Sequence, residues 1–237
     1  MDGLPGVQYS LPAMIAEQPA GLATADGVSL EARLALPDAP AGALVIAHPH
    51  PLYGGDMDNP VVVRVAEVCR ARAWATLRFN FRGVGGSGGT HGGGRAERQD
   101  VEAALVHLAS AVPAGTPLVL AGYSFGAVVA AGVAAGRRDT LAGLLLVAPA
   151  LAMTGDEPLR ALGPRGLPVL VVAGDRDEYC PTPALEALAG RWPTLEVRII
   201  PGANHFFFGK LYPLGEVVEA WAGGLEARQA GGRGAAG

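Results

Sequence analysis

The sequence LVLAGYSFGAVVAAGVAA, residues 118–135, decides the expected fold of this chain. It opens with a short apolar run typical of a buried strand. It then turns through Gly122-Tyr123-Ser124-Phe125-Gly126 and continues with small residues that suit a helix. A G-x-S-x-G sequence between a strand and a helix predicts a tight turn that holds the serine hydroxyl above the sheet. Ser124 is therefore the candidate nucleophile.

Apolar runs and helical segments alternate on both sides of this stretch. The runs are Ala43–Ala47, Ala75–Phe79, Leu118–Ala121, Leu144–Ala148 and Val169–Ala173. Helical spacing marks Asn59–Arg72, Arg95–Ala111, Ala127–Gly136, Thr182–Arg191 and Leu214–Ala227. Continuous apolar strands separated by helices predict an α/β fold with a doubly wound, mostly parallel sheet. The segment Leu22–Pro37 alternates differently and predicts an antiparallel hairpin that turns at Asp26-Gly27.

Length and composition predict one packed domain. Apolar residues make up 50% of the 237 residues and charged residues 17%, which favours a globular core over disorder. We expect a single domain over residues 1–230 and a disordered tail over the glycine-rich residues 231–237. Cys69 and Cys180 are expected to be free thiols.

The charge pattern limits the partners. The net charge is −4 and the arginines are scattered, which argues against a nucleic-acid partner. No apolar stretch has the length of a transmembrane helix, and the first residues lack the pattern of a signal peptide. These features predict a cytoplasmic protein without membrane attachment, whose partner is a small molecule. They leave the oligomeric state open.

With its serine turn, the chain resembles the α/β-hydrolase superfamily over almost its whole length. It is most similar to the small, lidless bacterial members that carry a His-Pro-His-Pro loop after the third strand. Here that loop is Ala47-His48-Pro49-His50-Pro51-Leu52-Tyr53-Gly54-Gly55. The resemblance implies about eight strands, helices on both faces of the sheet, no large lid and no cofactor or metal. It also implies a serine hydrolase whose triad follows the chain order serine, acid, histidine.

A serine nucleophile needs a neighbouring imidazole as its base. His205 lies in a loop after the apolar run Val197–Ile200, and the resemblance places the base in such a loop. His107 falls inside a helical segment, and His91 precedes every acid candidate. We therefore expect His205 to be the base.

The acid that orients the imidazole is expected in the loop after the run Val169–Ala173. The loop Gly174-Asp175-Arg176-Asp177-Glu178 offers three carboxylates. The G-x-x-D pattern of the resemblance favours Asp177, and Asp175 would then bind the turn. Sequence alone does not orient these side chains, so Asp175 remains the alternative.

Two backbone N–H groups are expected to stabilise a developing oxyanion. One belongs to Phe125, directly after the nucleophile and at the start of a helix. The other comes from the His-Pro-His-Pro loop, where Pro49 and Pro51 have no N–H. This leaves His48, His50 and Leu52, and the resemblance favours His50.

The expected pocket is open and shallow. Between Leu151 and Leu167 the chain has room for one short helix, around Glu157–Leu162, and none for a lid of several helices. The predicted substrate-binding side chains are Leu52, Tyr53, Tyr123, Tyr179 and Phe206. They predict a site for small acyl esters, cleaved through an acyl-serine intermediate in the manner of a carboxylesterase. A thioesterase or a peptidase could use the same triad.

Two other motifs suggest different chemistry. Gly83-Val84-Gly85-Gly86-Ser87-Gly88 matches a dinucleotide-binding pattern, but no helix begins directly after it, and the superfamily shows a similar loop from Arg82 to Ser87. His48 and His50 could bind zinc, but no further histidine has suitable spacing. A third alternative is a hydrolase-like binding module without catalysis, against which the complete candidate triad argues.

Overall fold

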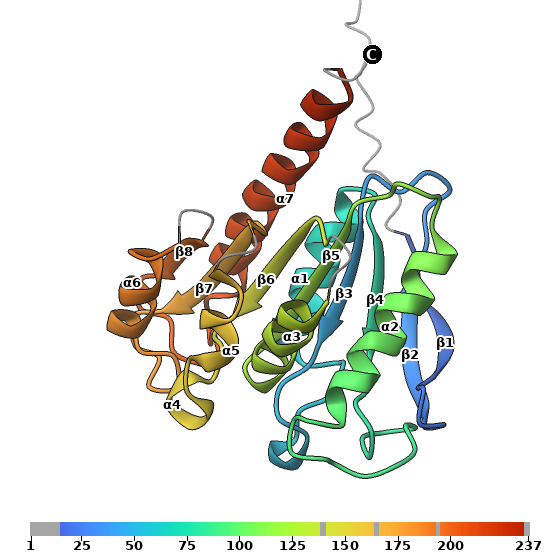
Figure 1. Ribbon diagram of the computed structural model, residues 1–237, viewed down its shortest axis with the longest axis horizontal. Helices are drawn as coiled ribbons and strands as arrows, with labels where there is room; N and C mark the ends of the chain where they lie inside the picture. The colour runs from blue at the N-terminus through green and yellow to red at the C-terminus, as the bar shows by residue number, and fades with distance from the viewer. Residues whose placement is uncertain (1–14, 138–140, 164–165, 193–194, 235–237) are drawn as a thin grey trace, which may run out of the picture.

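The computed structural model describes residues 15–137, 141–163, 166–192 and 195–234, with side chains to residue 229. Its centre is a sheet in which the described residues form eight strands, in the order β1-β2-β4-β3-β5-β6-β7-β8 (Figure 1). The strands are β1 (Gln18–Ala23), β2 (Ser29–Ala35), β3 (Ala43–Ala47), β4 (Ala75–Phe79), β5 (Leu118–Tyr123), β6 (Gly143–Val147), β7 (Val169–Gly174) and β8 (Leu195–Ile200).

The strands from β4 through β8 are parallel to one another, whereas β2 pairs antiparallel with both β1 and β4. Every residue of β3, β4, β6 and β7 is buried, as expected for strands covered on both faces. In β2 buried and partly exposed residues mix, which fits a strand near the edge. The predicted doubly wound sheet and the hairpin before it are confirmed.

Helices cover both faces of the sheet. The helices are α1 (Pro60–Ala71), α2 (Glu97–Ala111), α3 (Phe125–Gly136), α4 (Leu151–Thr154), α5 (Glu157–Arg160), α6 (Thr182–Ala189) and α7 (Leu211–Gly234), with a short 3₁₀ turn at Pro51–Tyr53. Helices α1 and α7 pack against each other on one face, and α2 packs against α3 on the other (Figure 1). Most buried apolar side chains of the described residues form one cluster.

Two short segments differ from the expectation. In its described part, the connection from β6 to β7 contains two four-residue helices, α4 and α5, where one helix around Glu157–Leu162 was expected. The short run after Pro149 carried no helical periodicity from which α4 could be predicted. Helix α7 continues to Gly234 and so extends into the segment 231–237, because adding residues to an existing helix is far easier than starting one. Residues 235–237 lie outside the described residues.

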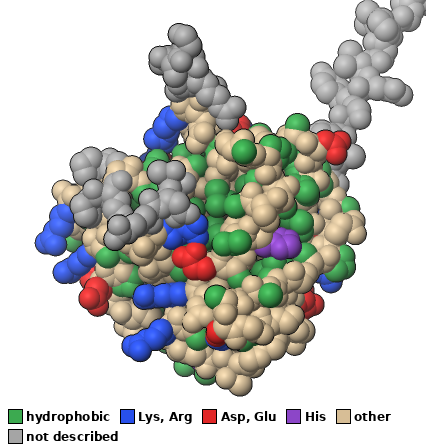
Figure 2. All heavy atoms as spheres, turned by 45° about the vertical axis from the view of Figure 1, so that its right-hand side comes forward, with side chains coloured by type: hydrophobic (Ala, Val, Ile, Leu, Met, Phe, Trp, Pro, Cys, Tyr) green, Lys and Arg blue, Asp and Glu red, His purple; other side chains and the backbone are tan. Residues whose placement is uncertain are grey.

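The described surface carries mixed charges, and the two cysteines are thiols. Basic and acidic side chains lie interspersed on the face seen in Figure 2. Cys69 and Cys180 are free, as predicted. Both are also buried, which raises the pKa of both thiols. In the described part of the chain, no helix combines the length and apolar character needed to span a bilayer.

Candidate active site

The turn after β5 holds Ser124 in a strained backbone conformation. Its φ is 56° and its ψ −116°, values that a residue with a side chain adopts only when the surrounding structure enforces them. Gly122 and Gly126 permit this turn because a Cβ on Gly122 would lie 2.3 Å from the Gly126 carbonyl oxygen. The Ser124 N–H donates to the Val147 carbonyl at 2.9 Å, which anchors the turn to β6. The serine hydroxyl is thereby presented at the carboxyl end of the sheet.

Three side chains from separate loops join in one hydrogen-bonded row. Ser124 Oγ lies 2.9 Å from His205 Nε2, and His205 Nδ1 lies 3.0 Å from both carboxylate oxygens of Asp177. Each of the three residues is less than 9% exposed. The loops follow β5, β8 and β7, whose parallel carboxyl ends meet at the same edge of the sheet. The structure thus brings together the predicted nucleophile, base and acid.

The two candidate acids differ in their partners. Asp177 also accepts the N–H groups of Tyr179 at 2.9 Å and Cys180 at 3.0 Å, which fix its carboxylate toward His205. Asp175 instead accepts the Gly202 N–H at 2.7 Å and ties its own loop to the turn after β8. Of the two carboxylates, only that of Asp177 reaches the imidazole.

Aromatic side chains surround the imidazole of His205. The Tyr179 ring centre lies 4.7 Å from that of His205, and the Phe206 ring meets it edge-on at 5.6 Å. The Tyr123 hydroxyl donates to the His205 carbonyl at 2.9 Å, and burial raises the pKa of this hydroxyl, so it keeps its proton. These contacts fix the loop that carries His205 and shield the ring from solvent.

The expected oxyanion donors lie beside Ser124 in the same cleft. Among the described residues, neither the N–H of Phe125 nor that of His50 has a hydrogen-bond partner. Phe125 opens α3, so its N–H falls in the first turn of a helix, where no carbonyl of the same helix can accept it. Both groups are therefore free to bind a negatively charged oxygen.

The His50 side chain has a defined protonation state. Its Nδ1 accepts the Leu52 N–H at 3.2 Å, so the ring proton sits on Nε2. Burial and the neighbouring His91 lower the pKa of His50, and Glu97 partly opposes this. The ring packs between Tyr53 and Phe125, with ring centres 4.8 and 4.7 Å away. A neutral imidazole thus stiffens the loop that carries the His50 N–H.

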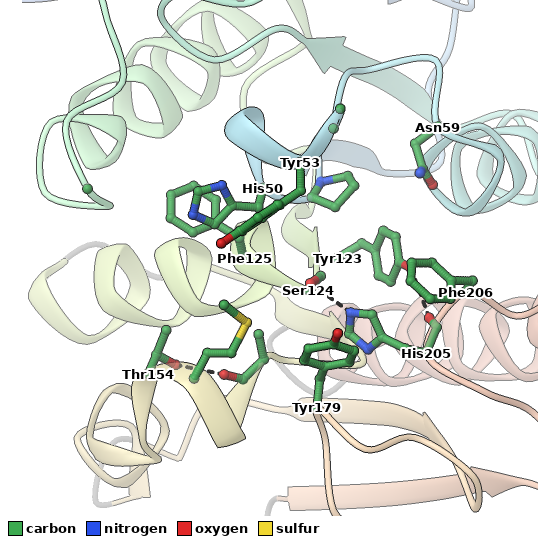
Figure 3. Close-up of a pocket in the computed structure, with 16 residues that line it drawn as sticks. His50, Tyr53, Asn59, Tyr123, Ser124, Phe125, Thr154, Tyr179, His205 and Phe206 are labelled. Carbon is green, nitrogen blue, oxygen red and sulfur yellow. Dashed lines mark hydrogen bonds between the residues drawn. The ribbon is translucent and has the colours of Figure 1, made fainter.

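A cleft of about 510 Å³ opens around Ser124. In Figure 3, His50, Tyr53 and Phe125 lie on one side of the serine, and Asn59, Tyr123 and Phe206 on the other. The cleft lining includes the predicted Tyr53, Tyr123, Tyr179 and Phe206 together with five residues that the sequence did not suggest: Asn59, Gly93, Ala150, Met153 and Thr154. The position of Asn59 could have been inferred from the sequence, since an asparagine before a proline often caps the start of a helix.

Leu52 does not line the cleft. Its side chain is 70% exposed, although the neighbouring Tyr53 is part of the wall. Successive residues of a 3₁₀ turn point in different directions, so only one of the two can face Ser124. Met153 and Thr154 belong to α4, which the sequence did not reveal.

His48 has no free ring nitrogen for a metal. Its Nδ1–H donates to the Pro49 carbonyl at 2.6 Å, and its Nε2 accepts the Phe81 N–H at 3.0 Å. Burial lowers the pKa of His48 from 6.5 to about 4, so the ring is neutral at neutral pH. The described residues also contain no group of three histidine, cysteine or acidic side chains that could hold a metal ion. The pairing of His48 with His50 as zinc ligands is therefore not supported.

N–H groups of the glycine-rich loop 83–88 donate hydrogen bonds to oxygens of the protein itself. The N–H of Gly83 donates to the Gly88 carbonyl at 2.9 Å, and the Gly86 N–H donates to Glu31 at 2.8 Å. The preceding Arg82 forms ion pairs with Asp100 and Asp26 at 2.7 and 2.8 Å. A phosphate-binding loop needs free N–H groups, so these contacts argue against the dinucleotide interpretation.

Comparison with known proteins gives concordant matches. A family model described as an alpha/beta hydrolase domain matches residues 40–211. The uncharacterized protein RP471 of Rickettsia prowazekii is 34% identical over 182 residues, which cover 74% of this chain and 75% of that protein. An alpha-beta serine hydrolase homologue from Coxiella burnetii is 33% identical, with a TM-score of 0.77 over 86% of this chain and 96% of its own.

A third match concerns the lid. XC6422 from Xanthomonas campestris, described as a serine hydrolase without a lid, is 28% identical, with a TM-score of 0.75. The match covers 86% of this chain and 92% of that chain. In the described part of the β6–β7 connection, α4 and α5 are the helices present, and each has four residues. This agrees with the expected absence of a large lid.

The buried, neutral His48 predicts a loss of stability in acid. Its folded-state pKa is depressed, so the unfolded chain binds a proton more readily, and the contribution of His48 is present above pH 6.5 and lost toward pH 4. The shift corresponds to about 3 kcal/mol in the free energy of unfolding. Urea unfolding of wild type and His48→Gln should give a difference that shrinks by about this amount from pH 7 to pH 4. If the difference in free energy of unfolding between wild type and His48→Gln stays constant with pH, His48 does not have this lowered pKa.

Proposed function

The chain belongs to the alpha/beta hydrolase family, and we propose that it is a carboxylesterase-like serine hydrolase that cleaves small acyl esters. The observation that carries this proposal is the hydrogen-bonded row Ser124–His205–Asp177 beside two N–H groups without partners among the described residues. Such an arrangement supplies a nucleophile, a base, an orienting acid and an oxyanion site together. A binding module without catalysis would not need a nucleophile, a base and an acid joined by hydrogen bonds beside an oxyanion site.

In the proposed first step, His205 Nε2 takes the proton from Ser124 Oγ as the oxygen attacks the ester carbonyl. The carbonyl oxygen becomes negatively charged and accepts the N–H groups of Phe125 and His50. His205 then gives its proton to the leaving alcohol oxygen, and an acyl-Ser124 remains. Water repeats the sequence and releases the acid.

Asp177 stabilises the charged imidazole in both steps. Its two oxygens stand 3.0 Å from His205 Nδ1, so the Nδ1–H tautomer is favoured and Nε2 remains free to accept the serine proton. The imidazolium exists only while a proton is in transit, so this interaction strengthens toward the transition state. Thioester or amide substrates would use the same groups, and amides are the most resistant of the three classes to attack. The cytoplasm is the compartment that we propose for this reaction.

The decisive test replaces the nucleophile. Ser124→Ala should lower kcat/KM on p-nitrophenyl acetate by about 10⁴-fold or more, because no covalent intermediate can form. The thermal unfolding midpoint should remain near that of wild type. Labelling with a fluorophosphonate should vanish in Ser124→Ala and persist in Ser110→Ala, which alters an exposed serine of α2. Retained turnover by a folded Ser124→Ala protein would refute the proposal.

The two loop carboxylates provide a matched pair. Asp177→Asn should reduce kcat by about 10⁴-fold, since an amide at this position favours the wrong tautomer of His205. Asp175→Asn should change kcat little and act on stability, because the Asp175 carboxylate accepts the Gly202 N–H and does not reach His205. Steady-state kinetics and urea unfolding of both variants test this. A catalytically dead Asp175→Asn with an active Asp177→Asn would reverse the assignment.

The open cleft predicts a preference for short acyl groups. A buried methylene contributes about 0.8 kcal/mol only where the pocket covers it, and the cleft of about 510 Å³ is rimmed by exposed side chains such as Tyr53 and Phe206. We expect kcat/KM to peak on p-nitrophenyl acetate or butyrate and to fall for laurate and palmitate. The rate should also show no jump when the substrate passes its solubility limit. A maximum at long chains would reveal a deeper acyl site.

A further inference from the structure

The loop between β3 and α1, residues 48–59, is tied at its start to the end of β4. Strands β3 and β4 are parallel neighbours with Ile46 opposite Arg78, so both chains leave the sheet at the same level. Just beyond this point the buried His48 accepts the Phe81 N–H at 3.0 Å. The first residue of the loop is thereby held by the segment that follows β4.

A second tie fixes the far end of the same loop. The Met57 N–H donates to Asn80 Oδ1 at 2.9 Å, and the Arg78 guanidinium donates to the Met57 carbonyl. Asn80 is 4% exposed and Arg78 5% exposed, so neither side chain is free to exchange these bonds for water. Both backbone groups of Met57 are thus bound by side chains from β4 and its carboxyl end.

Between the two ties, the loop closes on itself around His50. The His50 carbonyl accepts the N–H groups of Tyr53 and Gly55, each at 3.1 Å. A Cβ on Gly55 would stand 2.3 Å from the Pro49 carbonyl oxygen, so the chain must pass itself this closely. A shift of Met57 would therefore be carried through Gly55 to the backbone of His50.

Asn80 is itself held by the glycine-rich loop. Its Nδ2 donates to Glu31 Oε2 at 2.8 Å, and the same oxygen accepts the Gly86 N–H at 2.8 Å. Ser87 Oγ donates to the Asn80 carbonyl at 2.7 Å. A Cβ on Gly85 would lie 2.5 Å from Asn80 Nδ2, which explains a glycine at that point. The loop that resembles a nucleotide-binding motif instead packs around one buried asparagine.

We propose that Asn80 is a positioning residue for the oxyanion site: through Met57 it sets the place of the His50 N–H. The inference rests on the proposed function of Ser124. Asn80 is not among the residues that line the cleft, and its effect is confined to one of the two oxyanion donors. Stabilisation of the oxyanion depends steeply on donor position, so a small displacement costs rate without altering substrate binding.

The test uses Asn80→Asp, which loses the Nδ2–H donor to Glu31. Repulsion between the two carboxylates should then displace the oxygen that accepts the Met57 N–H. We expect kcat to fall by about tenfold or more, with KM changed by less than about twofold. Affinity for a trifluoromethyl ketone, which forms a tetrahedral oxyanion on the serine, should fall by the same factor as kcat/KM. Adding Glu31→Gln to Asn80→Asp removes the facing carboxylate and should restore much of the kcat and of the ketone affinity.

Thr76→Val is the matched control. Thr76 lies on β4, the strand that Asn80 follows; it is fully buried, and its hydroxyl has no hydrogen-bond partner among the described residues. Its kcat, KM and ketone affinity should match those of wild type. If Asn80→Asp does not fold, Asn80→Ser leaves room for water at Met57, and the same losses are expected.

The outcomes separate this inference from the proposed function. Unchanged kcat and ketone affinity in folded Asn80→Asp or Asn80→Ser would overturn the positioning role. So would a lower kcat with unchanged ketone affinity, because the effect would then bypass the oxyanion site. Activity that persists in Ser124→Ala would instead overturn the proposed function.

Discussion

The close approach of two backbone segments at the serine turn constrains the rest of the site. A Cβ on Gly126 would lie 2.4 Å from the His48 carbonyl oxygen, so the start of α3 rests directly against the loop after β3. The same turn holds Ser124 at a φ of 56°. Because the two segments touch, the residues that carry the Phe125 and His50 N–H groups lie at the same cleft.

Side chains supply the enclosure that a lid gives in larger enzymes. The connection after β6 forms only α4 and α5 in its described part, and neither is long enough to cover Ser124. The side chain of His205 is nevertheless only 10% exposed, since the rings of Tyr179 and Phe206 pack against it. An open cleft and a shielded base are thus compatible. Neighbouring side chains need only cover the imidazole, and the whole site does not have to close.

Sequence patterns predicted the parts of this molecule that depend on local chemistry. Continuous apolar runs located the buried strands, and the glycines of the serine turn located Ser124. Side-chain direction and long-range partners were not predictable. The choice between Asp175 and Asp177 needed the hydrogen bond to His205, and Leu52 differed from Tyr53 only through the turn that carries them. Periodicity fixes faces of regular elements, and these residues lie in loops.

The two glycine-rich segments show why composition alone does not identify an anion site. In residues 83–88 the N–H groups of Gly83, Gly86 and Gly88 are all used by protein oxygens. At the serine turn, with fewer glycines, the Phe125 N–H has no such partner among the described residues. What distinguishes the loops is which donors remain unpaired after folding, and that depends on residues as distant as Glu31. An oxyanion site is therefore a property of the whole hydrogen-bond arrangement around the sheet edge, and a short motif captures only the half that is local.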